Sequence, residues 1–332
     1  DIARQFRIGW APDEWDALAS QAGVEEKVLD DVGLAFRNRR NRMQDALRGR
    51  VVFPIMNDSG DPVAVGGRIL PGSTDPAKYK NSPETPIYTK SRVLYGLNWA
   101  KGEIVRQNLA VVCEGYTDVI GFHRSGVPTA VATCGTAFTE EHVKLLKRYT
   151  SRVVLAFDAD AAGQGAAERF YEWEREYDIE VSVAKLLGGK DPGDLAQSNP
   201  ESLPLAIEQA SPFLAFRIDR VLATMPSNTP EHRTRAAERA MAVVNEHPNV
   251  NVRKLYAGEV ATRLDLPVQD LVLIAEQGGR APAFTVPASR RRNAPRDNAE
   301  FAVLAVLVQD WDAVAPWLAG PLFSDTANRQ VF

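Results

Sequence analysis

Between residues 107 and 188 the chain alternates between short apolar runs and longer amphipathic segments. The apolar runs are typical of buried strands, and between them apolar residues recur three and four positions apart, as in a helix. The runs are NLAVVCEG, PTAVATCG, RVVLAFDAD and IEVSVAKLL. Because strands that alternate with helices form right-handed βαβ units, we predict a parallel-sheet α/β domain over residues 107–195.

The flanking regions have other patterns. WDALASQAG and EEKVLDDVGLAF show helical spacing, whereas VVFPIMNDSGDPVAVGGRIL predicts two strands joined by a turn, so residues 1–106 should form a mixed α/β subdomain. We expect the polar segment GSTDPAKYKNSPETPIY to be a surface loop. Residues 196–279 are helical in pattern and predict a bundle, and the Gly-, Pro- and Arg-rich residues 280–297 predict a linker. The predicted fold class is therefore α/β, or α+β over the whole chain.

Length and composition exclude some classes of protein. A chain of 332 residues can hold two or three domains, and its 45% hydrophobic and 25% charged residues are ordinary for globular proteins. We expect neither a membrane span nor a secretory signal, because no apolar run is long enough and no basic start precedes one. Only Cys113 and Cys134 are present, outside any C-x-x-C, so we expect no zinc site and a reducing, cytoplasmic setting. Because the chain begins at Asp1, we expect it to be a fragment.

The charge of the chain is unevenly distributed. The formal net charge is −4, but residues 37–106 hold thirteen Lys and Arg against six Asp and Glu, a local charge of +7. A basic first third beside an acidic remainder is typical of proteins that hold a polyanion in one region and a metal in another. An Arg-rich solvated surface would explain the count equally well.

Three carboxylates follow two of the apolar runs. Glu114 comes directly after LAVVC, and Asp158 and Asp160 come directly after RVVLAF. An unpaired buried carboxylate costs several kcal/mol, so each of these acids needs a cation, a hydrogen-bonding nest or solvent. A single acid in this position is often only a turn or helix cap. Three acids at the carboxyl ends of parallel strands, where the sites of such sheets form, predict a shared site.

Further acids surround this expected site. Asp118 lies one helical turn after Glu114, and GGKDPGDL adds Asp191 and Asp194 after the last strand. A site with carboxylates and no His or Cys ligands favours Mg²⁺ or Mn²⁺ over zinc. We therefore predict metal-assisted phosphoryl transfer, in which metal ions stabilise the attacking and leaving oxygens.

The motifs EGYTDV, GTA, FDADAAG and KDPGDL together resemble a Toprim domain, the catalytic fold shared by bacterial primases, topoisomerases and some nucleases. The blocks FRIGWAPDEW, RGRVVFPIMNDSGDPVAVGGRIL and KYKNSPETPIYTKSRVLYGLNWAK resemble the RNA polymerase core of bacterial DNA primases of the DnaG type. This resemblance extends from residue 1 to about residue 278. The segment 298–332 resembles the beginning of the family's helicase-binding C-terminal domain, here truncated, and the family's zinc-binding domain is absent from the sequence.

The resemblance implies roles for particular residues. Glu114 would be the catalytic glutamate, as a general acid or base and as a metal-associated group, while Asp158 and Asp160 would be catalytic and the principal metal ligands. Asp118 and Asp191 would support them, whereas Asp194 departs from the family's D-P-D pattern by one position. Six residues match the family's basic ridge, which holds template, initiating nucleotide or RNA–DNA hybrid: Arg48, Arg50, Arg68, Lys78, Asn81 and Lys90.

The resemblance also implies a function. The chain would be a DNA primase core that makes short RNA primers for replication, by metal-dependent nucleotidyl transfer from ribonucleoside triphosphates on single-stranded DNA. The replicative helicase would bind through the missing part of the C-terminal domain. The alternatives are another Toprim enzyme, such as a phage-type primase-helicase or a topoisomerase, and a non-catalytic nucleic-acid- or helicase-binding module. No cleaving tyrosine can be assigned, G-x-x-x-x-G-K-[ST] does not occur in the sequence, and the intact acids favour an enzyme.

Overall fold

The computed structural model describes residues 2–156, 164–186 and 191–277. The chain divides into two units, residues 1–279 and residues 280–332, and all the elements below belong to the first. The predicted linker and the predicted truncated domain therefore lie outside the described residues. Among the described helices, none combines the length and the apolar character that a membrane span requires.

Of the two segments with helical spacing, EEKVLDDVGLAF contains a helix of six residues, whereas WDALASQAG forms none. The region before the antiparallel sheet forms only two short helices, and its remaining elements are strands of three residues: α1 Ile2–Gln5, β1 Gly9–Ala11, α2 Glu26–Asp31, β2 Ala35–Arg37 and β3 Met43–Asp45. The amides of Leu18 and Ala19 bond to the carboxylate of Asp45, at 2.7 and 3.0 Å, instead of to a helical carbonyl. Trp15 and Leu18 are about half exposed, so the apolar spacing of this segment faces no core that would support a helix.

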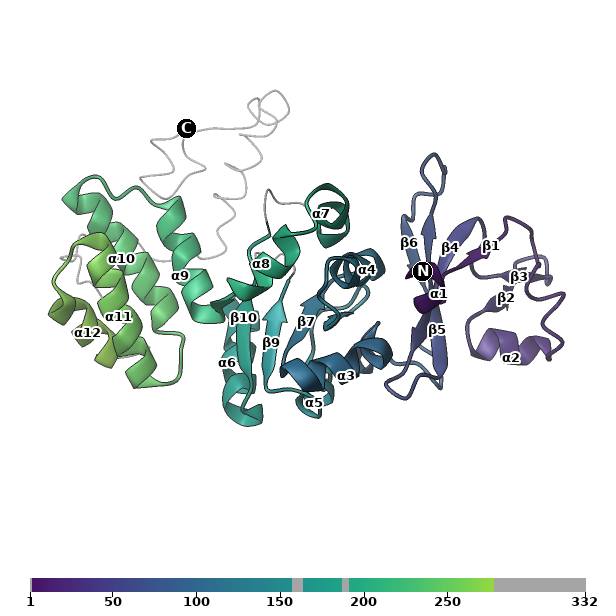
Figure 1. Ribbon diagram of the computed structural model, residues 1–332, viewed down its shortest axis with the longest axis horizontal. Coiled ribbons are helices and arrows are strands. Elements are labelled where there is room, and N and C mark those ends of the chain that lie inside the picture. The colour runs from purple at the N-terminus through teal and green to yellow at the C-terminus, as the bar shows by residue number, and fades with distance from the viewer. Residues whose placement is uncertain (1, 157–163, 187–190, 278–332) are drawn as a thin grey trace, which may run out of the picture. The chain divides into compact units, whose positions relative to one another are not determined.

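An antiparallel sheet follows, with strand order β1-β4-β5-β6. The predicted hairpin is confirmed as β4 (Arg50–Met56) and β5 (Pro62–Ile69). Its turn is held by the Asn57 side chain, whose oxygen accepts the amides of Gly60 and Asp61 at 2.9 Å each. The predicted surface loop contains a further strand, β6 (Tyr79–Asn81), which pairs with Gly66–Arg68 of β5. Figure 1 shows this sheet separate from the parallel strands that follow.

The predicted parallel domain is confirmed. Its sheet has the order β11-β10-β9-β7-β8, and all neighbours are parallel except β11 (Ser211–Pro212), which runs antiparallel to β10. The parallel strands are β7 Ala110–Cys113, β8 Ala130–Ala132, β9 Arg152–Leu155 and β10 Glu180–Val183. The helices that connect or precede them are α3 Leu97–Gln107, α4 Tyr116–Arg124, α5 Glu140–Lys147 and α6 Gln164–Tyr177, with the 3₁₀ helix η1 Lys90–Arg92 before α3.

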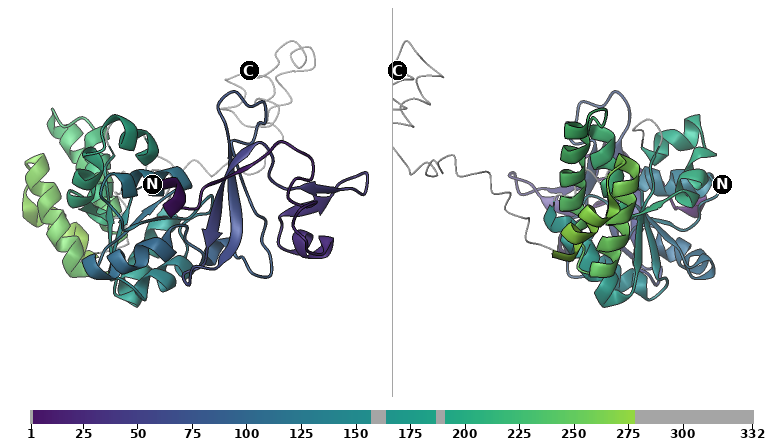
Figure 2. Two further views of the ribbon diagram at one scale, coloured as in Figure 1. Left: turned by 45° about the vertical axis from the view of Figure 1, so that its right-hand side comes forward. Right: turned by 90° about the vertical axis from the view of Figure 1, so that its left-hand side faces the viewer.

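Both faces of the parallel sheet are covered by helices, as the views in Figure 2 show. Ala110 and Val112 pack in one core with residues of α3, α5 and α6. Val111 and Cys113, which point to the opposite face, pack in a second core with residues of α4, α7 and α8. Burial on both faces explains why these strands are continuously apolar in sequence.

The predicted helical region is also confirmed. Its helices are α7 Pro192–Ser198, α8 Ser202–Glu208, α9 Phe213–Thr224, α10 Pro230–Val244, α11 Val250–Leu264 and α12 Val268–Gln277. Residues of α9 to α12 belong to the same hydrophobic core as α6 and one face of the parallel sheet. The helical region is thus built directly onto the sheet, which limits its freedom to move against the parallel domain.

Candidate active site

A cleft of about 560 Å³ lies at the carboxyl ends of the parallel strands. It is lined by Lys78, by Tyr79 and Asn81 of β6, by residues of the loops after β7 and β8, and by residues of α4 and α6. Glu114, Asp118 and Asp191 all line this cleft. The structure therefore brings together three of the predicted acids and two of the predicted basic-ridge residues, at the edge where open α/β sheets bind their ligands.

Glu114 and Asp118 have different surroundings. Glu114 directly follows β7 and is exposed. Asp118 is buried, and its Oδ2 accepts the amide of Gly115 at 2.9 Å, which closes the first turn of α4. Burial raises the pKa of Asp118 to about 6, although hydrogen bonds from the N–H groups of Gly115 and Gly193 lower it. Asp118 thus has a structural task of its own, whereas the Glu114 carboxylate is presented to the cleft.

Asp191 and Asp194 are separated by the geometry of α7. Asp191 caps this helix, because its Oδ1 accepts the amide of Asp194 at 2.7 Å, and it also lines the cleft. Asp194 is exposed and is not among the residues that line the cleft. Its position in the first turn lets it interact favourably with the helix dipole, which accounts for an acid there. Asp194 thus lies outside the described lining of the cleft, and its assignment as a metal ligand stays a prediction.

The chemistry of the described cleft fits a hard divalent cation in part. Glu114 and Asp191 offer carboxylate oxygens, and burial raises the pKa of the Cys134 thiol, so Cys134 is a protonated and poor ligand for a soft metal. Among residues 2–156, 164–186 and 191–277, no group of three carboxylate, His or Cys side chains could hold a metal ion. Asp158 and Asp160, the predicted principal ligands, lie outside the described residues.

The basic residues beside the cleft lie around Tyr79. The guanidinium of Arg68 lies 5.7 Å and the Lys78 ammonium 5.8 Å from the centre of its ring, and its hydroxyl is 3.3 Å from Thr117 Oγ1 on α4. Lys78 is exposed and Arg68 is half-buried. Two cations are thus held beside one aromatic ring, and of the two Lys78 lines the cleft together with the acids.

Asn81 connects β6 with residues of the parallel domain. Its Nδ2 donates to the carbonyl of Cys134 at 2.8 Å, and its Oδ1 accepts a hydrogen bond of 2.8 Å from the hydroxyl of Tyr116. The Tyr116 ring lies parallel to Phe53 of β4, with centroids 4.9 Å apart. It also lies so close to Gly66 that a Cβ added there would be 2.2 Å from the hydroxyl oxygen. Close packing therefore fixes the antiparallel sheet against the loops of the parallel domain.

The other predicted basic residues lie away from this cleft. Arg50 is 1% exposed and forms an ion pair of 2.6 Å with Asp75, so the structure contradicts its prediction as a direct contact to nucleic acid. Arg48 pairs with Asp13 at 3.2 Å and stacks over Trp15, and it lines a separate polar cavity. Lys90 lies on η1, outside the residues that line the cleft.

Sequence reasoning missed Tyr79 and Arg169 of α6 as residues of the cleft. The loop Thr133–Phe138 after β8 is indicated by the motif GTA, and the structure places it in the lining of the cleft. Gly135 there has a φ of +86°, a conformation that favours glycine at a sharp turn. Arg169 could not have been found from the sequence, because nothing in a helical pattern distinguishes one exposed arginine from another.

The fold and the cleft define a Toprim-type α/β domain that is joined to a basic antiparallel sheet. A Toprim-like family matches residues 111–196, and the family described as the N-terminal domain of the DNA primase catalytic core matches residues 1–101. The DnaB-helicase binding domain of primase matches residues 214–269. This last match lies on α9 to α12, whereas the sequence had suggested residues 298–332.

Known proteins of similar sequence and structure are DNA primases. The DNA primase of Streptomyces coelicolor is 36% identical over 308 residues, which cover 87% of this chain and 47% of that protein. The DNA primase of Escherichia coli is 33% identical over 273 residues, or 80% of this chain and 47% of that protein. The RNA polymerase domain of Mycobacterium tuberculosis primase DnaG, in complex with double-stranded DNA carrying an overhang, matches with a TM-score of 0.71 and 33% identity. That match covers 80% of this chain and 86% of the solved chain.

A DnaG primase catalytic domain bound to single-stranded DNA matches with a TM-score of 0.64 and 33% identity, over 81% of this chain and 86% of that one. The chain belongs to the family of bacterial DnaG-type DNA primases. It spans about half the length of the curated relatives it matches.

Proposed function

We propose that this chain is the RNA-polymerising core of a DNA primase, which makes short RNA primers on single-stranded DNA by metal-dependent nucleotidyl transfer. The observation that carries the proposal is the cleft, where Lys78, Tyr79 and Asn81 line the same space as Glu114 and Asp191 at the acidic edge of the Toprim sheet. A polymerase must hold polyanionic substrates beside a cation site, and this cleft places both kinds of group within one space of about 560 Å³.

The basic and the acidic residues around the cleft have different proposed roles. Lys78 and Arg68 would neutralise phosphates of a nucleotide or of nucleic acid, and Glu114 would hold a metal ion or accept a proton from the attacking 3′-hydroxyl. Mg²⁺ or Mn²⁺ fits the oxygen donors, with Asp158 and Asp160 proposed as the principal ligands. When bound, such a metal supplies Lewis-acid stabilisation of the charge on the transferring phosphate.

The proposed partners follow from the same assignment. They are single-stranded DNA template, ribonucleoside triphosphates, the RNA–DNA hybrid and the replicative helicase. The match of residues 214–269 to a helicase-binding domain supports the last of these and adds α9 to α12 as a contact, beside the C-terminal segment. A cytoplasmic location suits a replication enzyme, and it agrees with two buried free cysteines.

Incorporation of labelled ribonucleotides on single-stranded DNA, with Mg²⁺ or Mn²⁺, tests the proposal. We expect Asp158→Ala and Glu114→Gln to lose at least 100-fold in rate, roughly the loss for a removed charge-stabilising group. Asp194→Asn, which changes an acid outside the cleft, should stay within a few-fold of wild type. If no variant differs from wild type, the site assignment is wrong. If the wild type binds DNA but makes no RNA even with a zinc-binding domain supplied, a binding module replaces the enzyme.

A further inference from the structure

Arg50 of β4 is buried against the neighbouring strand β5, at a position where β5 has a glycine and therefore no side chain. The Arg50 side chain is 2% exposed and passes over Gly67 of β5, where a Cβ would be 3.1 Å from Arg50 Cδ and 3.0 Å from Leu47 Cδ2. Its Nη2 is 2.6 Å from Asp75 Oδ2, and its Nη1 lies 3.4 Å from the carbonyl of Gly67. An arginine buried in this way has a fixed position, and its guanidinium contacts only the few acceptors that line its site.

Asp75 and a further partner, the carbonyl of Lys78, belong to the loop between β5 and β6. Asp75 also accepts the amide of Ala77 at 2.9 Å through Oδ1. Hydrogen bonds from Ala77 and Arg50 lower the pKa of Asp75, so its carboxylate stays charged over the ordinary working range. Arg50 reaches the carbonyl of Lys78 at 3.5 Å, and the same carbonyl accepts the amide of Ile69 at 3.1 Å. The ion pair therefore fixes the loop at the residues that directly precede and include Lys78.

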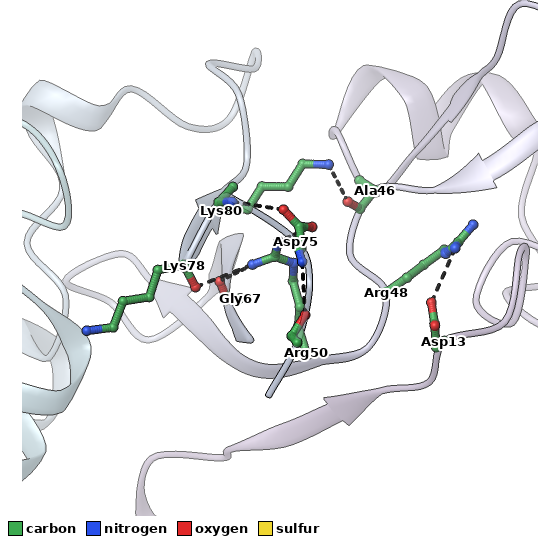
Figure 3. A network of polar contacts seen from close by, with 10 residues as sticks. Asp13, Ala46, Arg48, Arg50, Gly67, Asp75, Lys78 and Lys80 are labelled. Atoms are coloured by element: carbon green, nitrogen blue, oxygen red, sulfur yellow. Dashed lines mark hydrogen bonds and ion pairs between the residues drawn. The ribbon is translucent and has the colours of Figure 1, made fainter. Parts of the chain in front are cut away.

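Lys78 connects this loop to the cleft. Its carbonyl faces Arg50, while its side chain points away from Arg50, as Figure 3 shows, and lines the cleft with Glu114. The loop carries no helix, and its residues 71–78 are exposed. Two kinds of contact restrain the backbone of Lys78: its carbonyl accepts the Ile69 amide of β5 at 3.1 Å, and Arg50 holds the preceding loop through Asp75 and reaches the same carbonyl. A cation that must meet a phosphate at a defined place needs such a restraint, because a free loop would average its position.

We propose that the Arg50–Asp75 ion pair is a positioning device, which holds the Lys78 ammonium in the cleft for the phosphates of an incoming ribonucleotide. The inference rests on the proposed function, and it assigns to Arg50 an indirect role in place of a contact with nucleic acid. Arg50 and Asp75 act through the backbone of Lys78, and neither touches substrate.

The test compares Asp75→Ala in the wild type and in a Lys78→Ala background, using the whole chain. Asp75→Ala should raise the apparent KM for ribonucleotides about tenfold, the loss typical of one charge-assisted hydrogen bond, and leave kcat within twofold. In the Lys78→Ala background it should change neither value further. Asp75→Asn keeps an acceptor for Ala77 and should recover part of the loss. A merely structural role would lower kcat as well and would persist in the second background.

The matched control is Asp31→Ala. It removes an ion pair with Lys27 of the same 2.6 Å length, in the same region of the chain, but both of its partners are exposed. It should leave KM unchanged. Gly67→Ala supplies a second variant that keeps every charge, because its Cβ crowds Arg50, and it should raise KM as Asp75→Ala does.

Hydrogen exchange separates failure of this inference from failure of the proposed function. The amides of Ile69 and Ala77 should exchange faster in Asp75→Ala than in wild type, whether or not the chain makes RNA. Unchanged exchange of both amides would overturn the positioning role. So would a KM effect that is as large in the Lys78→Ala background, or one that Asp31→Ala reproduces. If exchange rises but no RNA forms with any variant, the proposed function fails while the restraint on Lys78 stands.

Discussion

Glu174 is a half-buried carboxylate whose ionisation should weaken the fold. It lies on α6, and its Oε1 accepts the amide of Val181 on β10 at 3.0 Å. Burial raises the pKa of Glu174 from 4.5 to about 7, although the hydrogen bond from Val181 lowers it. Because the pKa is higher in the folded state, folding favours the protonated form. The stability that this group contributes is present below pH 4.5 and is lost as the pH rises through 7.

Glu174→Gln removes the charge and keeps an oxygen that can accept the Val181 amide. The difference between pKa 4.5 and about 7 corresponds to a penalty of ~3 kcal/mol for the ionised carboxylate in the folded state. We therefore expect the variant to be more stable than wild type by about 3 kcal/mol at pH 8. At pH 5 most of the penalty is absent, and the gain should fall to about 1 kcal/mol.

Urea unfolding at pH 5 and pH 8 measures this difference, with fluorescence of the buried Trp173 next to Glu174 as the probe. Glu172→Gln, an exposed carboxylate on the same helix, is the control and should leave the pH dependence of stability as in wild type. A stability difference that is equal at the two pH values would refute the assignment of a raised pKa. A control with the same pH dependence as Glu174→Gln would show that the effect is not one of burial.

Two further substitutions, Gly66→Ala and Asp58→Ala, test how the antiparallel sheet is attached, with Gly102→Ala as a control for the first. Gly66→Ala places a Cβ 2.2 Å from the Tyr116 hydroxyl and should lower the free energy of unfolding by about 1–3 kcal/mol. Gly102→Ala, in open space on α3, should instead stabilise by about 0.5–1 kcal/mol in the same urea titration. Asp58 accepts side-chain hydrogen bonds of 3.0 Å from Arg148 and Tyr149, which directly follow α5. Asp58→Ala removes both bonds and should lower the free energy of unfolding by about 1–2 kcal/mol, measured by calorimetry. An unchanged melting temperature would contradict this expectation.

The parallel domain could be predicted from sequence because its signal is local. Each strand is buried on both faces and reads as an apolar run, and each helix repeats its own period beside it. The first fifty residues lack such a signal. Their strands have three residues, too short to show alternation, and β1 exists because Gly9 pairs with Val52, more than forty positions away. Pairing at that distance is tertiary information, which a periodicity in sequence does not carry.

The basic residues illustrate the same limit within a single motif. Arg48 and Arg50 stand two positions apart in RGR, and nothing in that pattern distinguishes them. Although both line the same polar cavity, their surroundings differ: Arg50 is buried over Gly67 and paired with Asp75, whereas Arg48 remains partly exposed beside Asp13. A charge count predicts that a region is basic, but the choice between a substrate contact and a buried support depends on residues from other strands.

The acids after the parallel strands were predicted to act together, yet in the structure they have two kinds of task. Asp118 and Asp191 each hold a backbone amide at the start of a helix, α4 and α7 respectively. Helix capping therefore explains them even in the absence of any metal. Glu114 has no such explanation, because its carboxylate makes no hydrogen bond or ion pair with another described residue and is exposed in the cleft. Because Glu114 is exposed, water can hydrate its carboxylate, and no other described residue competes with a ligand for its oxygens. Among the described acids, the case for a cation or a substrate proton therefore rests most directly on Glu114.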